Sequence, residues 1–254
     1  AGEADFSNYV SLGNSLTAGF ADNALYIQGQ QNSYPNILAG QFKLVGGGEF
    51  IQPLMEDNLG GLLLNGMQIT NNRLVLSTAS GSPAPTTIAG APQTEITNKL
   101  SGPFNNMGVP GAKSFHLVAP GYGAAAGLPS QSNPYFVRFS TSETTTVLED
   151  ALAQNPSFFS LWIGNNDILS YATSGGTGED QAGNLDPSTY GSTDITDPND
   201  FGGVFTQLIN ELNVNASGGV LYNIPNVTDI QIFTTVQNNS LVLSPAAAGS
   251  RPGF

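Results

Sequence analysis

The sequence predicts an α/β protein whose core is a parallel β-sheet covered by helices. Two nearly continuous apolar runs, at residues 157–164 and 218–224, are typical of strands buried on both faces of such a sheet. Between them, residues 201–214 carry apolar side chains at the spacing of an amphipathic helix. A strand, a helix and a strand in this order favour a parallel pair joined by a helical crossover.

The chain before this unit predicts further elements of both kinds. Residues 5–13 (DFSNYVSLG) form a short β-prone run that ends in glycine, which indicates a first strand. Residues 36–42 predict a helix, because Asn32 or Ser33 can cap it and Pro35 suits its first turn.

In the middle of the chain, the sequence predicts one strand, one extended segment and one helix. These follow a long insertion. Residues 104–109 indicate a core strand, residues 134–139 (PYFVRF) an extended segment, and residues 144–154 the clearest helix. Residues 45–100 are rich in Gly, Pro, Thr and Asn, so we expect an insertion of loops and short strands. Within that insertion, residues 73–76 are the best strand candidate.

Two stretches lack a periodic pattern. Residues 172–200 consist almost wholly of Gly, Asp, Ser and Thr and predict a long surface loop, and residues 236–254 predict no regular element. The chain has 31 Gly and 16 Pro, which is consistent with long, turn-rich connections. Its length of 254 residues suits one α/β domain, so we expect residues 1–254 to form a single domain.

Composition excludes several classes of function. The formal net charge of −13 argues against a nucleic-acid partner and against adhesion to anionic lipid surfaces. The chain has no cysteine, so disulfides, thiolate metal sites and cysteine nucleophiles are excluded. No apolar run is long enough to predict a transmembrane helix. The acidic, lysine-poor composition hints at secretion, and we expect a signal segment to have been removed.

The residues suited to catalysis lie in three turns, each directly after a predicted strand. These turns are GNSL at residues 13–16, NMGVPGA at residues 106–112 and GNND at residues 164–167. Because the carboxyl ends of parallel strands meet at one edge of a sheet, we expect the three turns to face a common crevice.

Together the three turns offer what acyl transfer requires. Ser15 supplies a hydroxyl that can attack a carbonyl and a backbone N–H that can stabilise the resulting oxyanion. Gly111 allows a backbone N–H to approach a ligand without a side chain in the way, and the Asn166 amide is a neutral donor. Taken alone, a serine in such a turn is usually a helix cap or a turn residue, so the argument depends on all three turns.

The three turns resemble blocks I, II and III of the SGNH hydrolases, the GDSL esterases and lipases. Residues 13–16 match block I, Asn106-x-Gly108-x-x-Gly111 matches block II, and residues 164–167 match block III. The resemblance implies a flavodoxin-like three-layer α/β/α fold with a parallel central sheet. Residues 32–38 (NSYPNIL) and 218–225 resemble long secreted or lipid-anchored bacterial members, which implies an extracytoplasmic location.

The resemblance also implies the site residues. Ser15 is then the nucleophile, and Ser15, Gly111 and Asn166 form the oxyanion hole. Their neighbours Asn14, Gly164 and Asn165 are expected to bind substrate, and no metal or organic cofactor is implied. The substrate would be a carboxylic ester, either of a lipid, of an acetylated carbohydrate or of a small molecule, and the resemblance does not select among them. It leaves the oligomeric state open.

Two features depart from the family pattern. Asn14 stands where the family has Asp, which removes a charge without removing the triad acid. The family's C-terminal Asp-x-x-His block is absent, because the single histidine, His116, has Lys113 three residues before it. We interpret His116 as a structural or surface residue, with a relocated catalytic base as the alternative. We also interpret the chain as a piece of a longer enzyme that continues with a final strand, an Asp-x-x-His loop and a last helix.

The missing block keeps two other functions open. The chain could be a non-catalytic surface or carbohydrate-binding protein on a hydrolase scaffold, or an inactive fragment of a longer esterase. The acidic stretch Asp194–Asp200 could bind calcium, although such loops are usually only solvated. We expect Asp167 to hold its turn by hydrogen bonds.

The aromatic residues near these turns are interpreted mainly as core. Phe158, Phe159 and Trp162 lie within the predicted buried strand, so we expect them to pack in the core rather than to form a substrate platform. The sequence leaves open whether Tyr122 borders the crevice.

Overall fold

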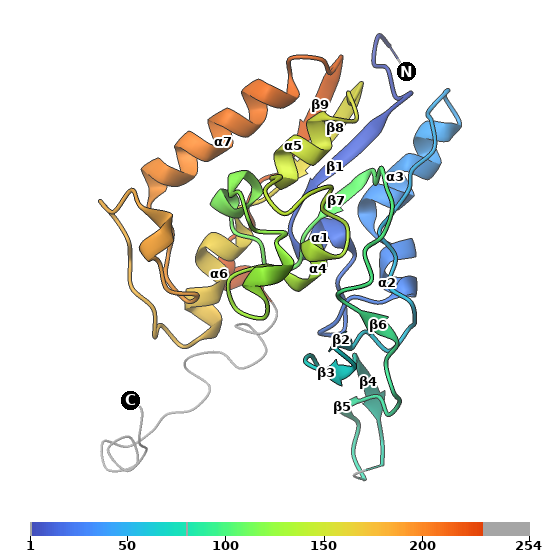
Figure 1. Ribbon diagram of the computed structural model, residues 1–254, viewed down its shortest axis with the longest axis vertical. Coiled ribbons are helices and arrows are strands. Elements are labelled where there is room, and N and C mark those ends of the chain that lie inside the picture. The colour runs from blue at the N-terminus through green and yellow to red at the C-terminus, as the bar shows by residue number, and fades with distance from the viewer. Residues whose placement is uncertain (1, 80, 231–254) are drawn as a thin grey trace. The chain divides into compact units, whose positions relative to one another are not determined.

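A computed structural model of the chain, which describes residues 2–79 and 81–230, is a mixed α/β structure around a four-stranded parallel sheet (Figure 1). The strand order is β7-β1-β8-β9, and each neighbouring pair is parallel. The strands are β1 (Tyr9–Gly13), β7 (Asn106–Gly108), β8 (Phe158–Trp162) and β9 (Gly218–Leu221). The predicted α/β class with a parallel central sheet is confirmed.

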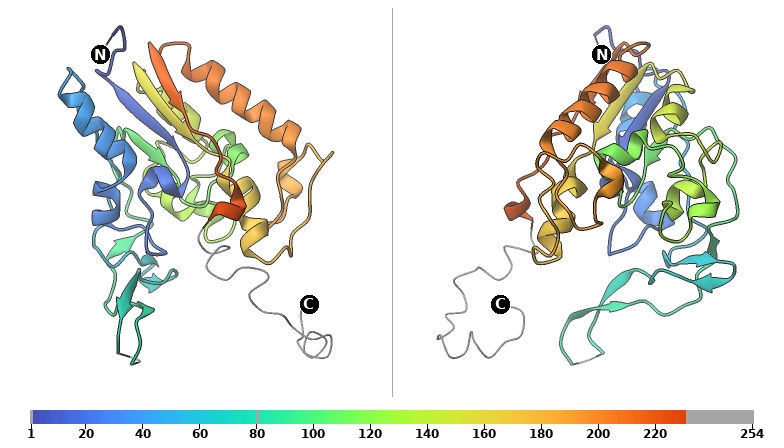
Figure 2. Two further views of the ribbon diagram at one scale, coloured as in Figure 1. Left: turned by 180° about the vertical axis from the view of Figure 1, so that it is seen from behind. Right: turned by 60° about the vertical axis from the view of Figure 1, so that its left-hand side comes forward.

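Helices cover both faces of this sheet. Figure 2 shows α3 (Tyr34–Lys43) on one side of the strands and α7 (Pro198–Leu212) on the other. Successive side chains of β8 point to opposite faces, so Phe158 packs with Tyr9 and α3, whereas Phe159 joins the larger core beneath α7 and α5 (Val147–Leu152). Phe158 and Phe159 are 9% and 2% exposed, which confirms their predicted place in the core.

The three neighbouring strands β7, β1 and β8 end at the same level. In the register of the sheet, Gly13 lies opposite Gly108 on one side and opposite Trp162 on the other. The turns that follow β1, β7 and β8 therefore leave the same edge of the sheet side by side. The prediction that the three turns meet at one edge of the sheet is confirmed.

Two glycines let α1 (Ser15–Ala18) pack directly against the strand ends. A Cβ atom on Gly108 would lie 2.3 Å from the backbone nitrogen of Ala18, and one on Gly13 would lie 2.3 Å from the carbonyl oxygen of Trp162. Both distances are far inside van der Waals contact with backbone atoms. Only glycine fits at these positions without displacing the turn that carries Ser15.

The remaining elements of residues 1–223 are short. Residues 45–100 contain two small sheets, formed by the strands β2 (Leu62–Leu64), β3 (Met67–Gln68), β4 (Leu74–Ser77), β5 (Ala84–Thr87) and β6 (Thr94–Glu95). The other helical elements are α2 (Ile27–Gln31), α4 (Pro134–Val137), α6 (Asn165–Thr173), η1 (Ser114–Val118), η2 (Ala125–Gly127) and η3 (Pro187–Thr189). The predicted strand at residues 73–76 corresponds to β4.

Two sequence predictions are corrected by the structure. Residues 134–139 are not extended, because Asn133 caps α4 by accepting hydrogen bonds from the backbone nitrogens of Tyr135 and Phe136 at 3.0 and 3.2 Å. The run at residues 218–224 is not a buried strand, because β9 is the edge of the described sheet. Its Val220 and Leu221 side chains are 40% and 46% exposed.

The chain divides into two compact units, Ala1–Asn223 and Ile224–Phe254. The described part of the second unit, residues 224–230, contains the single turn η4 (Val227–Asp229). Residues 236–254, for which the sequence predicts no element, lie outside the described residues. In the described part of the chain, no helix combines the length and apolar character needed to cross a membrane.

The close approach at Gly108 yields a first prediction. The substitution Gly108→Ala should lower the free energy of unfolding by about 2–3 kcal/mol, because the new methyl group meets backbone that cannot move aside cheaply. Gly203→Ala is the matched control: Gly203 lies inside α7 with open space around it, so this change should raise stability by about 0.5–1 kcal/mol. The free energy of unfolding of both variants is measured by urea denaturation. An unchanged urea midpoint for Gly108→Ala would contradict the close packing of Gly108 against Ala18.

Candidate active site

Hydrogen bonds join the three predicted turns into one site. Asn14 Nδ2 donates to Asn165 Oδ1 at 3.4 Å, which connects the turn after β1 with the turn after β8. Asn166 Nδ2 donates to the carbonyl oxygen of Ala112 at 2.9 Å, which connects the turn after β8 with the turn after β7. The structure therefore brings together the segments that carry all six residues predicted from the sequence.

Ser15 begins α1, and Asn14 is the cap of that helix. The buried Asn14 side chain accepts a hydrogen bond from the backbone nitrogen of Leu16 at 3.1 Å. Ser15 is partly exposed, and neither its hydroxyl nor its backbone N–H donates to any residue that the structure describes. The hydroxyl and the N–H are thus both free to meet a ligand, and Asn14 has a clear structural role where the family has Asp.

Gly111 lies in an exposed turn with a left-handed backbone, at φ +83°. Its backbone N–H donates to no described residue, and the nearest atom to its missing Cβ is Asn133 Nδ2 at 3.9 Å. Asn133 Nδ2 also donates to the carbonyl oxygen of Pro110 at 2.8 Å, which fixes the turn. A ligand can therefore approach the Gly111 N–H without meeting a side chain of that residue.

The turn after β8 leads into α6. Gly164, at φ +108°, occupies the cap position, and Asn165 and Asn166 form the first turn of the helix. The hydrogen bond to Ala112 uses one of the two N–H groups of the Asn166 amide. The other N–H is uncommitted among the described residues, so Asn166 can donate to a ligand while its side chain is held in place.

Asp167 fixes this turn through hydrogen bonds to Ser114. Its carboxylate accepts hydrogen bonds from Ser114 Oγ at 2.6 Å and from the backbone nitrogen of Ser114 at 2.9 Å. Burial raises the pKa of the Asp167 carboxyl, and the hydrogen bonds from Ser114 oppose that rise. Asp167 thus holds the turns after β7 and β8 together, as expected from the sequence.

His116 occupies a structural position in η1. Its Nδ1 accepts a hydrogen bond from the backbone nitrogen of Lys113 at 3.0 Å, and its ring stacks on Tyr122 with centroids 4.4 Å apart. Burial lowers the pKa of His116 to about 4, and the nearby positive charge of Lys113 adds to the effect. Because Nδ1 accepts, the proton of the neutral ring is on Nε2, which leaves no free nitrogen to act as a base.

Two cavities border these turns. One, of about 380 Å³, is lined by Gly111, His116 and Tyr122, so Tyr122 does lie beside the candidate site. The other, of about 680 Å³, is lined by Leu16 and Trp162. Trp162 is only partly buried, so the prediction that it is a core residue needs correction: it is the last residue of β8 and its side chain reaches a cavity wall.

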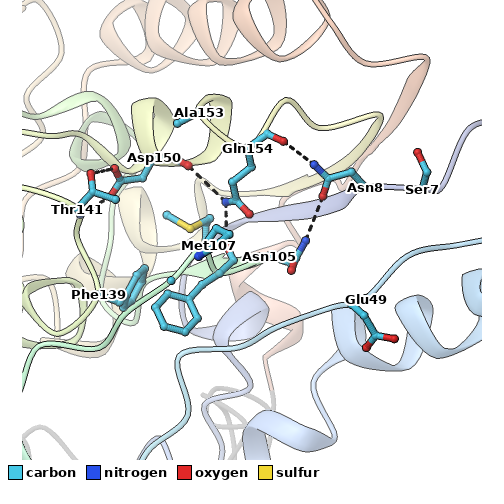
Figure 3. A pocket seen from close by; sticks show the side chains of 13 residues that line it. Ser7, Asn8, Glu49, Asn105, Met107, Phe139, Thr141, Asp150, Ala153 and Gln154 are labelled. Carbon is cyan, nitrogen blue, oxygen red and sulfur yellow. Dashed lines mark hydrogen bonds between the residues drawn. The ribbon is translucent and has the colours of Figure 1, made fainter.

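A third cavity lies at the opposite edge of the sheet (Figure 3). It measures about 510 Å³ and is lined by residues that precede the strands, among them Asn8, Asn105 and Gln154. Their amides are engaged with each other and with backbone: Asn105 Nδ2 donates to Asn8 Oδ1 at 3.3 Å, and Asn8 Nδ2 donates to the Gln154 carbonyl oxygen at 2.5 Å. Since ligands of parallel sheets bind at the carboxyl ends of strands, this cavity is not part of the candidate site.

The acidic stretch Asp194–Asp200 binds backbone N–H groups. Asp194 accepts from the nitrogens of Glu179 and Gly191 at 2.9 and 2.7 Å. Asp197 caps α7 by accepting from the nitrogens of Asn199 and Asp200 at 2.7 and 3.0 Å. Within residues 2–79 and 81–230, no three or more His, Cys, Asp or Glu side chains gather where they could hold a metal ion.

Sequence reasoning missed the supporting roles of several residues. Ser114 binds Asp167, and Asn106 Nδ2 ties β7 to the Thr17 carbonyl oxygen at 2.9 Å. Asn133 supports Gly111, and the pair Asn133-Pro134 is a recognisable helix start that could have revealed α4. Nothing in the sequence could have indicated the contacts of Ser114, because they join segments far apart in the chain.

The chain was compared with models of known protein families, with curated proteins and with solved structures, and none of the three comparisons finds a match.

The buried environment of His116 yields a second prediction. Its folded pKa of about 4 lies below its unfolded value of about 6.5, so it stabilises the fold fully above pH 6.5, and this stabilisation is lost as the pH falls towards 4. The loss should be on the order of 2–3 kcal/mol. His116 is the single histidine, so its ring protons can be followed without ambiguity by NMR.

A pH titration of the folded protein should give a His116 midpoint near 4, and a midpoint near 6.5 would contradict the burial described here. Unfolding measured at pH 6.5 and pH 4.5 supplies the second readout. His116→Gln should lose less stability over this interval than the parent protein, because both share the response of the carboxylates and only the parent has the imidazole.

Proposed function

We propose that this chain carries the catalytic core of a serine esterase of the SGNH hydrolase type, which hydrolyses carboxylic esters through a Ser15 acyl-enzyme. The observation that carries the proposal is the level ending of β7, β1 and β8. It sets the turn with the free Ser15 hydroxyl between the turn with the free Gly111 N–H and the turn with the Asn166 amide. Lipid esters, acetylated carbohydrates and small esters all fit this chemistry.

In the proposed reaction, Ser15 Oγ forms a bond to the ester carbonyl carbon, and the carbonyl oxygen takes up negative charge. The N–H groups of Ser15 and Gly111 and the amide of Asn166 donate hydrogen bonds to this oxyanion. Collapse of the tetrahedral intermediate breaks the bond to the alcohol, which leaves with the proton given up by the Ser15 hydroxyl. Water then attacks the acyl-enzyme, releases the carboxylic acid and returns a proton to Ser15 Oγ. The hydrogen bond between Asn14 and Asn165 holds the two turns in register, and Asn14, Gly164 and Asn165 are the residues proposed to bind the substrate.

The proposal assigns the general base to none of the described residues. The resemblance implies a histidine in an Asp-x-x-His segment, and the one histidine of this sequence is His116. Its Nδ1 is occupied by the Lys113 nitrogen, so the relocated-base alternative finds no support in its contacts. The rate of ester hydrolysis by this chain alone is therefore the rate that Ser15 supports without an identified base.

The finer fold and the location of the protein belong to the same proposal. A parallel sheet with helices on both faces, and a nucleophile directly after the first strand, support a flavodoxin-like SGNH fold. The acidic composition and the resemblance to secreted bacterial members support an extracytoplasmic location.

One observation favours a second candidate function. Because no described residue donates to or accepts from the Ser15 hydroxyl, the chain can also be a non-catalytic carbohydrate-binding protein on a hydrolase scaffold. The two candidates differ in whether Ser15 reacts with an ester.

The nucleophile is tested with p-nitrophenyl acetate. Ser15→Ala should lower turnover to the uncatalysed background rate, because Ser15 is the nucleophile that the proposal assigns to the acyl-enzyme. Ser101→Ala, a change to an exposed serine in a loop, is the matched control and should leave turnover unchanged. Equal turnover by Ser15→Ala and the parent protein would contradict the proposal.

The oxyanion hole is tested with Asn166→Ala. Loss of one preorganised donor should lower kcat by roughly 10²-fold with a smaller change in KM. The hydrogen bond to Ala112 is lost as well, so the free energy of unfolding should fall by about 1 kcal/mol. A variant that loses this stability but keeps full kcat would show that Asn166 only supports the turn.

A further inference from the structure

The cavity beside Leu16 has a wall that is both rigid and amphipathic. Trp162 stacks on Tyr222 with ring centroids 5.0 Å apart and an angle of 20° between the rings. The edge of Tyr34 packs on Trp162 at 5.5 Å, and the Tyr34 hydroxyl is held 3.2 Å from Thr17 Oγ1. These contacts fix the aromatic wall next to the turn that carries Ser15.

The indole N–H of Trp162 is not exposed in this cavity. Its indole Nε1 is buried and donates to no atom of residues 2–79 and 81–230. A ligand in the cavity therefore meets the indole ring rather than its N–H. Trp162 ends β8 opposite Gly13, which places it beside the Ser15 turn.

The lining of the same cavity also includes neutral amides. Gln28 and Gln31 lie on α2, both are exposed, and their side-chain amides bind no other described residue. The adjoining Asn32 uses its Nδ2 on the Gln28 carbonyl oxygen at 2.8 Å, which leaves its Oδ1 free. Each amide can donate and accept a hydrogen bond, as a ligand rich in hydroxyl groups requires.

The lining contains no Asp, Glu, Lys, Arg or His. An anionic ligand would find no cation there and would approach a chain with a net charge of −13. A cationic ligand would find no carboxylate. A long acyl chain would cover the aromatic wall but would remove water from the amides of Gln28 and Gln31 without replacing their hydrogen bonds. The fitting ligand is neutral, with an apolar face and many hydroxyl groups.

We propose that this cavity binds the neutral sugar portion of a glycan ester whose acyl group is attacked by Ser15. The sugar ring lays its C–H face towards the apolar wall formed by Leu16, Tyr34 and Trp162, and its hydroxyls bind Gln28 and Gln31. The inference rests on the proposed esterase function for its link to Ser15. The substrate class that it names is acylated neutral carbohydrates and not lipids.

Trp162 makes the site directly measurable, because it is the single tryptophan of the chain. The Ser15→Ala protein is titrated with neutral xylo-, cello- and N-acetylated chito-oligosaccharides while its tryptophan fluorescence is recorded. At least one series should give a saturable change with a dissociation constant on the order of millimolar. Acidic oligogalacturonates should give none at the same concentrations.

The amides are tested by substitution. The double change Gln28→Ala and Gln31→Ala should raise the dissociation constant of the best oligosaccharide about tenfold or more. Gln41→Ala, which removes an exposed amide on α3 outside the cavity, is the control and should leave binding unchanged. The inference is overturned if no neutral oligosaccharide changes the fluorescence. It is also overturned if octanol, used as an apolar probe, changes the fluorescence and no oligosaccharide does.

Failure of this inference can be told from failure of the esterase function. Turnover of p-nitrophenyl acetate that depends on Ser15, without oligosaccharide binding, keeps the esterase and removes the sugar site. Oligosaccharide binding that weakens with the double change, without Ser15-dependent turnover, supports the sugar site and favours the non-catalytic carbohydrate-binding protein.

Discussion

The backbone of α1 lies so close to the end of β7 that no side chain fits between them, and most of the candidate site follows from this contact. Gly108 has no Cβ, so the Ala18 nitrogen can approach it. Gly13 likewise has no Cβ, so the carbonyl oxygen of Trp162 at the end of β8 can approach it. The tight packing turns the chain sharply after β1 and leaves Ser15 at the top of the sheet. Asn106 reinforces the contact by binding the Thr17 carbonyl oxygen.

Support for the site comes from groups that never touch a substrate. Asp167 binds Ser114 through both of its carboxylate oxygens, and Asn133 binds the carbonyl oxygen of Pro110. These bonds fix the turns after β7 and β8, and the side chain of Asn14 caps α1. The donors proposed for the oxyanion are therefore held before a ligand arrives, which is the condition under which such donors stabilise charge most strongly.

The sequence predicted the parts of this arrangement that depend on local pattern. The strand at residues 157–164, the helix at residues 201–214 and the three turns follow from apolar runs, helical spacing and glycine. The edge position of β9 could not be predicted, because an apolar run looks the same at the centre and at the edge of a sheet. The helix at residues 134–137 was missed because aromatic and β-branched residues favour strands, whereas a cap at Asn133 overrides that preference here.

The residues that line the cavity beside Leu16 also could not be predicted from local sequence patterns. Trp162 lies in an apolar run that indicates core, and only the register with Gly13 places it at the strand end, where a side chain can face outward. Likewise, nothing in the sequence connects Gln28 and Gln31 with Trp162, because their meeting depends on how α2 packs near α1. Long-range packing, which local patterns do not record, decides which of these residues face a ligand.

The most direct test of the account is a crystal structure of the protein after reaction with a small alkyl fluorophosphonate. The account predicts phosphorus bonded to Ser15 Oγ, with the phosphoryl oxygen about 3 Å from the nitrogens of Ser15, Gly111 and Asn166 Nδ2. Phosphorus on another serine, or a phosphoryl oxygen turned to solvent away from these donors, would contradict the claim that the level ends of three strands assemble an ester-hydrolysing site.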